Sequence, residues 1–572
     1  MSNEDGTIWI TYNGEVYNHA KLRQELEPRG HVYKSHSDTE TLLHAYEEWG
    51  IDFIQRLEGM FAIGLWDGRE KVLYLIRDRI GVKPLYYTLL PGQILFGSEI
   101  KALLCHLHVS KEMDLNAFYH YLTFAATPAP FTMFKGIKKL DPGHFIRVDQ
   151  AGHAQIVQYW DPIVNNDGDQ SFYSNEDYCI REIRRLLLES VEKRLMSDVP
   201  FGVFLSGGVD SSTNVALMSQ LMNRPVDTFS VGFKGESPFD ELLYARRIAE
   251  HLKTNHHEVL IGEREFLDCF CTLAFYQDEP LADPVCVPLY YVAQLARKNG
   301  TIVIQVGEGS DELFSGYDSY LQYFKRWKRI WRPYQKVPYN IRKFLNDIAG
   351  RRFQRGKREF LRRAANEEGF FWGSTTAFLE SEKEDLLSPQ VLKDVNGNNS
   401  WEVVQRFWEV VGAKTSNSDF LKKMIYLEIK NRLPELLLMR VDKMTMANSV
   451  EARVPFLDHK IVEMAMKIPS EYKVRGGIGK YILKKAVRGL IPDEIIDRPK
   501  VGFCGSSNNM LTGGLLQFAE AMYHKKRNGL QSFFVPPYLE TLFSDHRSGR
   551  YDNSFKIWNL LNFGLWYDHW FK

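Results

Sequence analysis

Hydrophobic and polar positions along the chain predict two parts that are built differently. In the first part, short β-branched and aromatic runs at residues 8–12 and 72–76 end in polar turns, which is typical of strands. A helical pattern around residues 39–49 interrupts these strands. We predict an α+β domain over residues 1–162. A stretch rich in Gly, Asn and Asp then predicts a linker over residues 163–177.

After this linker the pattern changes to a regular alternation of helices and strands. Ile180, Ile183, Leu187 and Val191 recur at steps of three and four, which predicts an amphipathic helix. Helical patterns then alternate with four apolar runs that are typical of buried strands, at residues 201–205, 228–233, 257–260 and 301–305. This alternation predicts an α/β doubly wound domain with a parallel sheet over residues 178–572. Beyond residue 317 we expect mainly helices.

A glycine-rich segment joins the first of these strands to a helix. Residues 206–212 read Ser-Gly-Gly-Val-Asp-Ser-Ser. The glycines let the backbone approach a ligand closely, and the start of the helix offers free N–H groups to phosphate. Asp210 would repel phosphate unless a cation lay between them, so it implies Mg²⁺. No lysine follows as in the G-x-x-x-x-G-K loops of phosphate-transferring enzymes. An ordinary turn would need the glycines but neither the Asp nor the serines.

Further candidate residues follow the ends of neighbouring strands. Leu205 ends the first strand, and Val231 lies in the second. Gly307, Glu308 and Asp311 follow the fourth strand in another glycine-rich, acidic loop. Because ligands bind at the carboxyl ends of strands in open α/β sheets, we predict that Glu308 and Asp311 act on the same nucleotide as the loop at residues 206–212.

Composition narrows the class of protein. Lys+Arg and Asp+Glu are equal at 72 each, so the chain lacks the basic excess of a nucleic-acid-binding protein. The basic run at residues 351–363 is interpreted as a solvated helix face. Six cysteines in 572 residues do not form a disulfide scaffold. No apolar run reaches the roughly 18 residues of a membrane span, and no signal peptide is visible. We expect a cytoplasmic protein that binds neither nucleic acid nor membranes.

Nine motifs, in order along the chain, resemble those of the B-type, glutamine-dependent asparagine synthetases. They are found at residues 13–18, 37–38, 57–62, 77–81, 97–101, 206–212, 307–312, 451–458 and 498–503. The resemblance covers essentially the whole chain. It implies an Ntn-type αββα glutaminase domain followed by a PP-loop synthetase domain that splits ATP into AMP and pyrophosphate.

The resemblance also implies roles for individual residues. Asp210 and Asp311 resemble the Mg²⁺ ligands. Glu308 resembles the acid that helps ammonia attack the activated carboxyl, and Lys480 resembles the lysine that neutralises charge on the α-phosphate. The nucleotide would be held by the adenine neighbours and by both glycine-rich loops: Leu205, Ser206, Gly207, Gly208, Val209, Asp210, Ser211, Ser212, Val231 and Gly307.

The implied reaction joins aspartate, ATP and ammonia in two steps. The β-carboxylate attacks the α-phosphorus and expels pyrophosphate, and ammonia then displaces AMP. Asn13 and Gly14 resemble the oxyanion-hole donors of the glutaminase, and Glu15 and Asp38 resemble its glutamine-binding residues. The resemblance further suggests a homodimer.

The start of the chain departs from the family pattern. Family members carry a catalytic cysteine directly after the initiator methionine, whereas this chain begins Met-Ser-Asn-Glu-Asp-Gly. We interpret Met1 as an internal methionine and the glutaminase domain as truncated at its N-terminus. We then expect the chain to use free ammonia, not glutamine, and to expose an unpaired sheet edge.

One residue-level question and three alternative functions stay open at this point. Asp278 and Asp283 lie in a loop that either holds the amino-acid substrate or is an ordinary acidic loop. The motifs report ATP and amide chemistry, so another carboxylate of a polysaccharide, peptide or antibiotic pathway is an alternative acceptor. A non-catalytic nucleotide-binding remnant and a tRNA-modifying enzyme are further alternatives.

Overall fold

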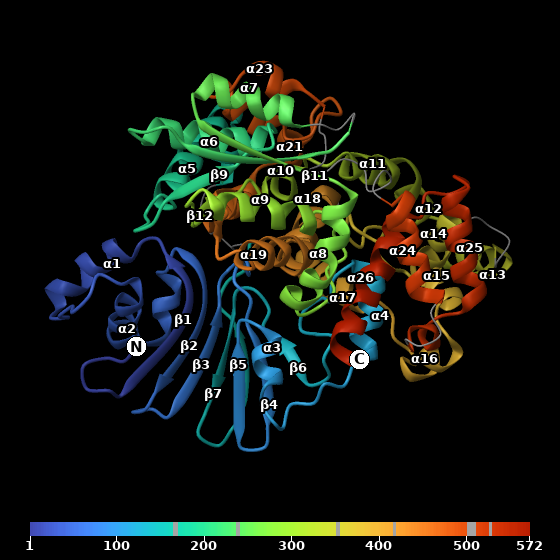
Figure 1. Ribbon diagram of the computed structural model, residues 1–572, viewed down its shortest axis with the longest axis horizontal. Helices are drawn as coiled ribbons and strands as arrows, with labels where there is room; N and C mark the ends of the chain where they lie inside the picture. Colours follow the sequence, from blue (N-terminus) through green and yellow to red (C-terminus); the bar gives the residue numbers. More distant parts are fainter. Residues whose placement is uncertain (164–169, 236–240, 350–354, 416–418, 500–510, 525–528) are drawn as a thin grey trace.

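The computed structural model describes residues 1–572 except 164–169, 236–240, 350–354, 416–418, 500–510 and 525–528. Most of the polar stretch that predicts the linker therefore lies outside the described residues. Figure 1 shows the strands of the N-terminal part, in blue and teal, below the mostly helical remainder of the chain.

The N-terminal part contains two antiparallel sheets. The larger sheet has the order β1-β2-β3-β7-β8, formed by Ile8–Val16, Gly59–Asp67, Val72–Arg77, His144–Val148 and Ala154–Gln158. The smaller sheet has the order β5-β4-β6, formed by Gln93–Gly97, Tyr86–Leu90 and Ile137–Lys139. Ile8 and Ile10 of β1 are buried while Trp9 between them is exposed, because successive side chains point to opposite faces of a strand. β1 lies at the edge of this sheet, and residues 1–3 pair with its first part, where Ile10 N–H donates to the Met1 carbonyl and Asn3 N–H to the Ile8 carbonyl.

Helices cover these sheets. α1 (His19–Leu26) and α2 (Asp38–Trp49) bury Leu22, Leu42 and Leu43 in a core that they share with β1 and β2. A second apolar cluster, which includes Leu75, Tyr87 and Ile146, lies between the sheets. α3 (Ile100–Leu104) and α4 (Leu115–Phe124) follow the smaller sheet. The predicted α+β sandwich is thus confirmed.

The second part is built on a parallel sheet. Its order is β11-β10-β9-β12-β13, formed by Asn255–Ile261, Asp227–Phe233, Phe201–Phe204, Val303–Gln305 and Glu451–Arg453. α5 (Glu176–Lys193), α6 (Val209–Leu221) and α7 (Leu242–Leu252) lie on one side of the sheet in Figure 1. α8 (Glu263–Gln277), α9 (Cys286–Lys298) and α19 (Met439–Met446) lie on the other. The predicted doubly wound sheet is confirmed, with β13 as an additional strand.

Beyond residue 317 the described chain is mainly helical, as predicted, apart from β13. A π-helical segment, Glu428–Leu438, contains Pro434 and runs directly into α19. The other helices of eight or more residues are α11 (Asp318–Arg326), α13 (Tyr339–Ala349), α14 (Arg355–Ala365), α17 (Trp401–Lys414), α18 (Phe420–Leu427), α20 (His459–Lys467), α24 (Gly513–His524), α25 (Pro536–Arg547) and α26 (Ser554–Phe571). The shorter ones include α10 (Ser310–Phe314), α15 (Glu380–Leu386), α16 (Pro389–Asp394), α22 (Tyr481–Ala486) and α23 (Asp493–Asp497).

The two parts share one continuous apolar core. Phe118 of α4 packs against Phe563 of α26 with ring centroids 4.4 Å apart. Buried ion pairs also cross between the parts: Lys83 Nζ lies 2.9 Å from Asp442, and Lys139 Nζ lies 3.1 Å from Glu435.

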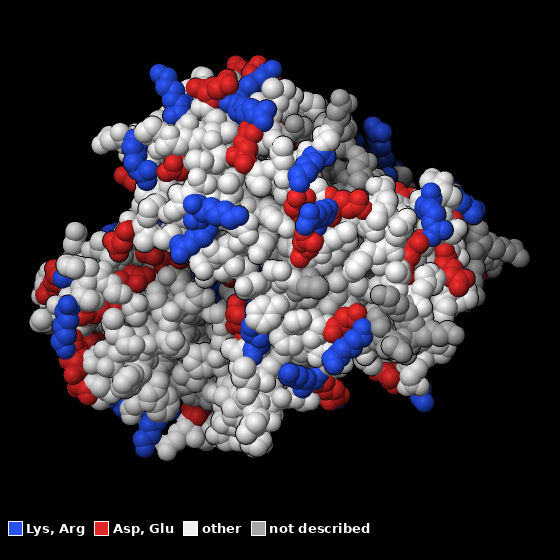
Figure 2. All heavy atoms as spheres, in the orientation of Figure 1, with Lys and Arg blue, Asp and Glu red and all other residues white. Residues whose placement is uncertain are grey.

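On the surface, acidic and basic side chains are interspersed over the face drawn in Figure 2. The basic run at 351–363 is described from residue 355 onward, in α14. There Arg362 pairs with Glu359 and Glu368, and Arg363 also pairs with Glu359. Both arginines are more than four-fifths buried, so the interpretation as a solvated face is wrong for them. Within the described ranges, no helix combines the length and apolar character that a membrane span requires.

Candidate active site

The segment between β9 and α6 forms a tight loop. Gly207 has φ +66°, a left-handed conformation that favours glycine. A Cβ at this position would lie 2.5 Å from the backbone nitrogen of Ala245 in α7. The first glycine is therefore required both by the turn and by the close packing of the loop against α7.

Serine hydroxyls fix the shape of this loop from inside. Ser211 Oγ accepts a hydrogen bond from the backbone N–H of Ser206 at 3.2 Å, and the Ser206 hydroxyl accepts one from Gly208 N–H at 3.3 Å. Asp210 lies in the first turn of α6 and accepts a hydrogen bond from the Ser310 hydroxyl at 2.7 Å. The start of α6, with its free N–H groups, thus faces the loop that follows β12.

The loop after β12 approaches the first loop closely. A Cβ at Gly307 would lie 3.1 Å from the backbone nitrogen of Ser211 and 3.0 Å from Asp210 Cβ. Gly309 has φ +92° and precedes α10, which carries Asp311. The two glycine-rich loops therefore meet at the carboxyl ends of adjacent strands, as predicted.

Lys480 joins these loops from a distant part of the chain. Its ammonium lies 2.6 Å from both Asp210 Oδ2 and Asp311 Oδ1. Lys480 itself adopts φ +55°, an uncommon conformation for a residue other than glycine. Gly316 makes room for it, because a Cβ there would lie 2.2 Å from Lys480 Cε and 1.9 Å from Asp311 Oδ1. Two carboxylates thus contact one cation, the ammonium group of Lys480.

Two cavities meet at the first loop. One, of about 350 Å³, is lined by Leu205, Val231, Gly307, Glu308 and Asp311, among others. The other, of about 490 Å³, is lined by residues that include Gly208, Val209, Lys480, Lys484 and Arg498. Ser206, Asp210 and Ser211 line both cavities.

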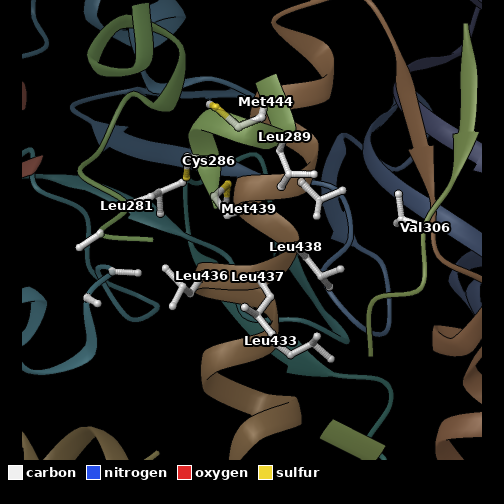
Figure 3. Close-up of a cluster of buried hydrophobic side chains, with 14 of the residues drawn as sticks. Leu281, Cys286, Leu289, Val306, Leu433, Leu436, Leu437, Leu438, Met439 and Met444 are labelled. Atoms are coloured by element: carbon white, nitrogen blue, oxygen red, sulfur yellow. The ribbon is translucent and has the colours of Figure 1, made fainter. Parts of the chain in front are cut away.

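The wall of the first cavity rests on packed aliphatic side chains. Figure 3 shows Leu433, Leu436, Leu437 and Leu438 of the π-helical segment beside Leu289 and Cys286 of α9. Leu289, Leu436 and Val306 also line the cavity. This apolar support fixes the position of the polar groups that project from the same helices.

A buried arginine forms ion pairs with two carboxylates that line the first cavity. Arg440, on α19, lies 2.7 Å from Glu308 Oε1 and also forms an ion pair with Asp283. Burial opposes the charge of Arg440, but the two carboxylates outweigh it and raise its pKa. Asp283 lines the cavity, whereas Asp278 is fully buried and pairs with Lys101 and Lys443 outside it.

The carboxyl group of Glu312 is buried beside this cavity. Burial raises its pKa to about 7, although Arg432 lies 3.3 Å away and favours the charged form. Tyr317 donates a hydrogen bond to the same carboxylate at 2.7 Å. Tyr317 and Arg432 both line the first cavity. The charge of Glu312 therefore acts on two side chains of that cavity's wall.

Comparison of the sequence with known proteins assigns the chain to a family. Residues 182–570 match the asparagine synthase family, and residues 1–160 match the glutamine amidotransferase domain family. The chain belongs to the asparagine synthase family. The chain is 34% identical over 569 residues to an asparagine synthetase (glutamine-hydrolysing) 1 of Bacillus subtilis, with 99% of this chain and 86% of that one covered. It is 33% identical to a putative asparagine synthetase (glutamine-hydrolysing) of Mycobacterium bovis, with 98% and 84% covered.

Membership in the asparagine synthase family confirms the resemblance that the motifs indicate, and with it an enzyme that forms C–N bonds in ATP-dependent asparagine synthesis. The amidotransferase match likewise confirms an Ntn-type fold for the N-terminal sandwich. The domain boundaries at residues 162 and 178 stay predictions.

In this asparagine synthase family member, the four predicted glutamine-binding residues lie around β1. Asn13 Nδ2 donates to Ser98 Oγ at 2.9 Å, and a Cβ at Gly14 would lie 2.0 Å from the carbonyl oxygen of Met60. Asp38 accepts hydrogen bonds from Tyr12 OH at 2.8 Å and Val16 N–H at 3.1 Å. Glu15 lies 3.1 Å from Arg453 of β13, and burial raises the pKa of Glu15 to about 7.

The structure does not place every predicted residue on a cavity wall. Gly207 and Ser212 line neither cavity, and the Ser212 hydroxyl is buried without a hydrogen-bond partner. Sequence reasoning missed Arg440 and Arg432. The sequence did offer one signal: both arginines stand in an otherwise leucine-rich segment of the chain. An arginine side chain is almost never buried unless it is paired with an acidic one.

Proposed function

We propose that the two cavities together hold ATP and aspartate for the formation of asparagine. Leu205 and Val231 provide apolar walls for adenine in the first cavity. Ser206, Gly208 and Ser211, with Lys484 and Arg498, line the second cavity, which suits the pyrophosphate portion. The α-phosphate would then lie where the cavities meet, beside Asp210 and Lys480.

The observation that carries this proposal is the contact of Lys480 with both Asp210 and Asp311. Two carboxylates that converge on one cation also supply the oxygen ligands that Mg²⁺ prefers, so these residues fit Mg²⁺. When bound, the metal would offset the negative charge of the phosphates. Lys480 would then be released to neutralise the α-phosphate as the aspartate carboxylate approaches.

The first step forms a mixed anhydride. An oxygen of the aspartate β-carboxylate bonds to the α-phosphorus, and the bond between this phosphorus and the bridging oxygen breaks to release pyrophosphate. Because both reactants are anionic, the cations around Asp210 lower the electrostatic cost of their approach. Arg440 and Arg432, which line the first cavity, supply positive charge for the carboxylates of aspartate.

The second step forms the amide. Ammonia attacks the β-carbonyl carbon, and AMP leaves with the oxygen that came from aspartate. The attacking nitrogen must lose a proton, and the Glu308 carboxylate in the same cavity is positioned to accept it. Arg440 orients Glu308 through the contact at 2.7 Å.

The test supplies the purified 572-residue chain with ATP, Mg²⁺, aspartate and ammonium. Ammonium is used because it bypasses the glutaminase part, and glutamine is assayed in parallel. We expect asparagine, AMP and pyrophosphate in equal amounts. A panel of other carboxylates serves as the control for the acceptor. Folded protein that releases pyrophosphate with another acid but not with aspartate would overturn the proposal.

A further inference from the structure

A cluster of two histidines and a glutamate lies outside the nucleotide site. His44 and Glu47 lie on α2, and His31 lies just after the turn that ends at Gly30. Among the described residues, this is the one group of three or more His, Cys, Asp or Glu side chains arranged as metal ligands. His44 is 2% exposed, and His31 and Glu47 are 14% and 17% exposed at their side chains. The cluster is therefore largely shielded from solvent.

The separations within the cluster match a tetrahedral metal site. His31 Nδ1 and His44 Nδ1 are 3.2 Å apart, and Glu47 Oε2 lies 3.4 Å from His44 Nδ1 and 3.9 Å from His31 Nδ1. Ligands bound to zinc at 2.0–2.1 Å with tetrahedral angles lie about 3.3 Å from one another. Two imidazoles and one carboxylate are also ligand types that zinc prefers.

The outer nitrogens of both rings face carboxylates. His31 Nε2 lies 3.3 Å from Glu48, and His44 Nε2 lies 3.6 Å from Glu4 and 3.9 Å from Glu40. The contact with Glu48 favours a proton on His31 Nε2, which leaves a lone pair on His31 Nδ1, while His44 Nε2 is buried and lies beyond hydrogen-bond distance of its carboxylates. With a proton on Nε2 of each ring, the two Nδ1 lone pairs face each other at 3.2 Å and can bind one cation between them, whereas a proton on one Nδ1 would give a hydrogen bond between the rings. Such carboxylate–histidine pairs orient the ligands of many metal sites.

The surrounding contacts hold the cluster in place. Asn3 Nδ2 donates to Glu47 Oε1 at 2.8 Å, so Glu47 Oε2 is left facing the histidines. The Tyr33 ring lies 4.5 Å from the His44 ring and restricts its rotation. Gly30, with φ +101°, ends the preceding turn, and the His31 N–H bonds to the Leu26 carbonyl at 3.4 Å.

We propose that His31, His44 and Glu47 bind one zinc ion, with water in the fourth position. The ion joins the segment after α1 to α2. Through Asn3 and Glu4 it also connects the start of the chain to α2. Because Asp38 begins α2, the site stabilises the helix that carries a predicted glutamine-binding residue. Zinc binding therefore raises the thermal stability of the N-terminal part.

The experiment titrates the full chain, stripped of metal by a chelator, with Zn²⁺ in excess Mg²⁺, which competes with Zn²⁺ for the carboxylates of Asp210 and Asp311. We expect one saturable site and a higher unfolding temperature with zinc. His31→Asn and Glu47→Gln abolish that site. Glu48→Gln, which removes only the outer carboxylate, weakens binding about 10- to 100-fold. His36→Asn, an exposed histidine between the ligands in sequence, is the matched control and binds as wild type does.

Circular dichroism without metal establishes that each variant folds. As a second measurement, Co²⁺ replaces Zn²⁺, and its absorption reports coordination by nitrogen and oxygen ligands in a tetrahedral field. No saturable zinc binding to the folded wild-type chain would overturn the proposal. So would equal binding by the His31→Asn, Glu47→Gln and His36→Asn variants.

Discussion

At the scale of single residues, the site depends on positions where no side chain fits. Gly316 is the clearest case, since a Cβ there would overlap both Asp311 and Lys480. The sequence marks the loops by their glycines, but it does not show that Gly316 leaves room for a lysine more than 160 positions later. Lys480 is identified through the family resemblance, and its partners follow only from the structure.

Gly316→Ala should displace Lys480 from the two carboxylates. A misplacement of about 1 Å costs on the order of 100-fold in rate, so we expect a loss of kcat of that order. Steady-state pyrophosphate release measures it. Gly412→Ala is the control, because a Cβ at Gly412, within α17, meets no atom within 4 Å and should leave activity unchanged. Full activity in the Gly316→Ala variant would contradict the role assigned to this contact.

The raised pKa of Glu312 predicts that the stability of the protein depends on pH. Burial raises its pKa from the usual 4.5 to about 7, so the folded state holds this proton more tightly than the unfolded state. The resulting stabilisation is complete below about pH 4.5 and is lost as the pH rises through about 7. In Glu312→Gln this contribution is absent. Urea midpoints of both proteins at about pH 5 and about pH 8 test the prediction. A difference that does not change with pH would contradict it.

At the scale of elements, the sequence predicts the regular alternation of helices and strands well. It predicts short or irregular elements poorly. The strands around the loop at 206–212 are apolar runs bounded by turns, and the structure confirms them as β9, β10, β11 and β12. β13 was missed because its three residues, Glu451–Arg453, pair only with β12, far away in sequence. The π-helical segment was missed because its hydrogen bonds are not encoded in a simple period.

Gly207→Ala tests the element formed by β9, the loop and α6. Both its φ of +66° and the backbone of α7 at 2.5 Å oppose a Cβ. We expect weaker ATP binding together with a lower unfolding temperature, because the loop would move away from α7. Calorimetric titration with ATP and a thermal melt measure the two effects. Gly208→Ala provides the comparison, since its nearest contact is the Ser206 hydroxyl at 3.3 Å. Equal behaviour of the two variants would argue against this account of the loop.

At the scale of the whole molecule, the sequence predicts two parts but not the way in which they join. The shared core and the buried pairs of Lys83 with Asp442 and of Lys139 with Glu435 connect residues about 300 positions or more apart. No local pattern distinguishes these lysines from exposed ones. Their burial follows only from the docking of the N-terminal sheets against α19 and the π-helical segment.

Lys83→Met should destabilise the protein by about 3–5 kcal/mol, because Asp442 is left as an unpaired buried charge. Asp442→Leu alone should have a similar effect. The double variant should recover most of the loss, since the two effects are coupled. Urea unfolding of the four proteins measures the coupling. Additive effects in the double variant would show that the pair does not join the two parts as described.

The transfer of oxygen from aspartate to AMP is the most direct test of the proposed chemistry. Aspartate labelled with ¹⁸O in its β-carboxylate is converted with ATP, Mg²⁺ and ammonium, and the AMP is analysed by mass spectrometry. Because the β-carboxylate oxygen stays on the α-phosphorus when ammonia displaces AMP, we predict one ¹⁸O atom in each AMP formed. Label in inorganic phosphate, with ADP as the nucleotide product, would instead indicate attack on the γ-phosphorus and would contradict the roles assigned to Asp210, Asp311 and Lys480.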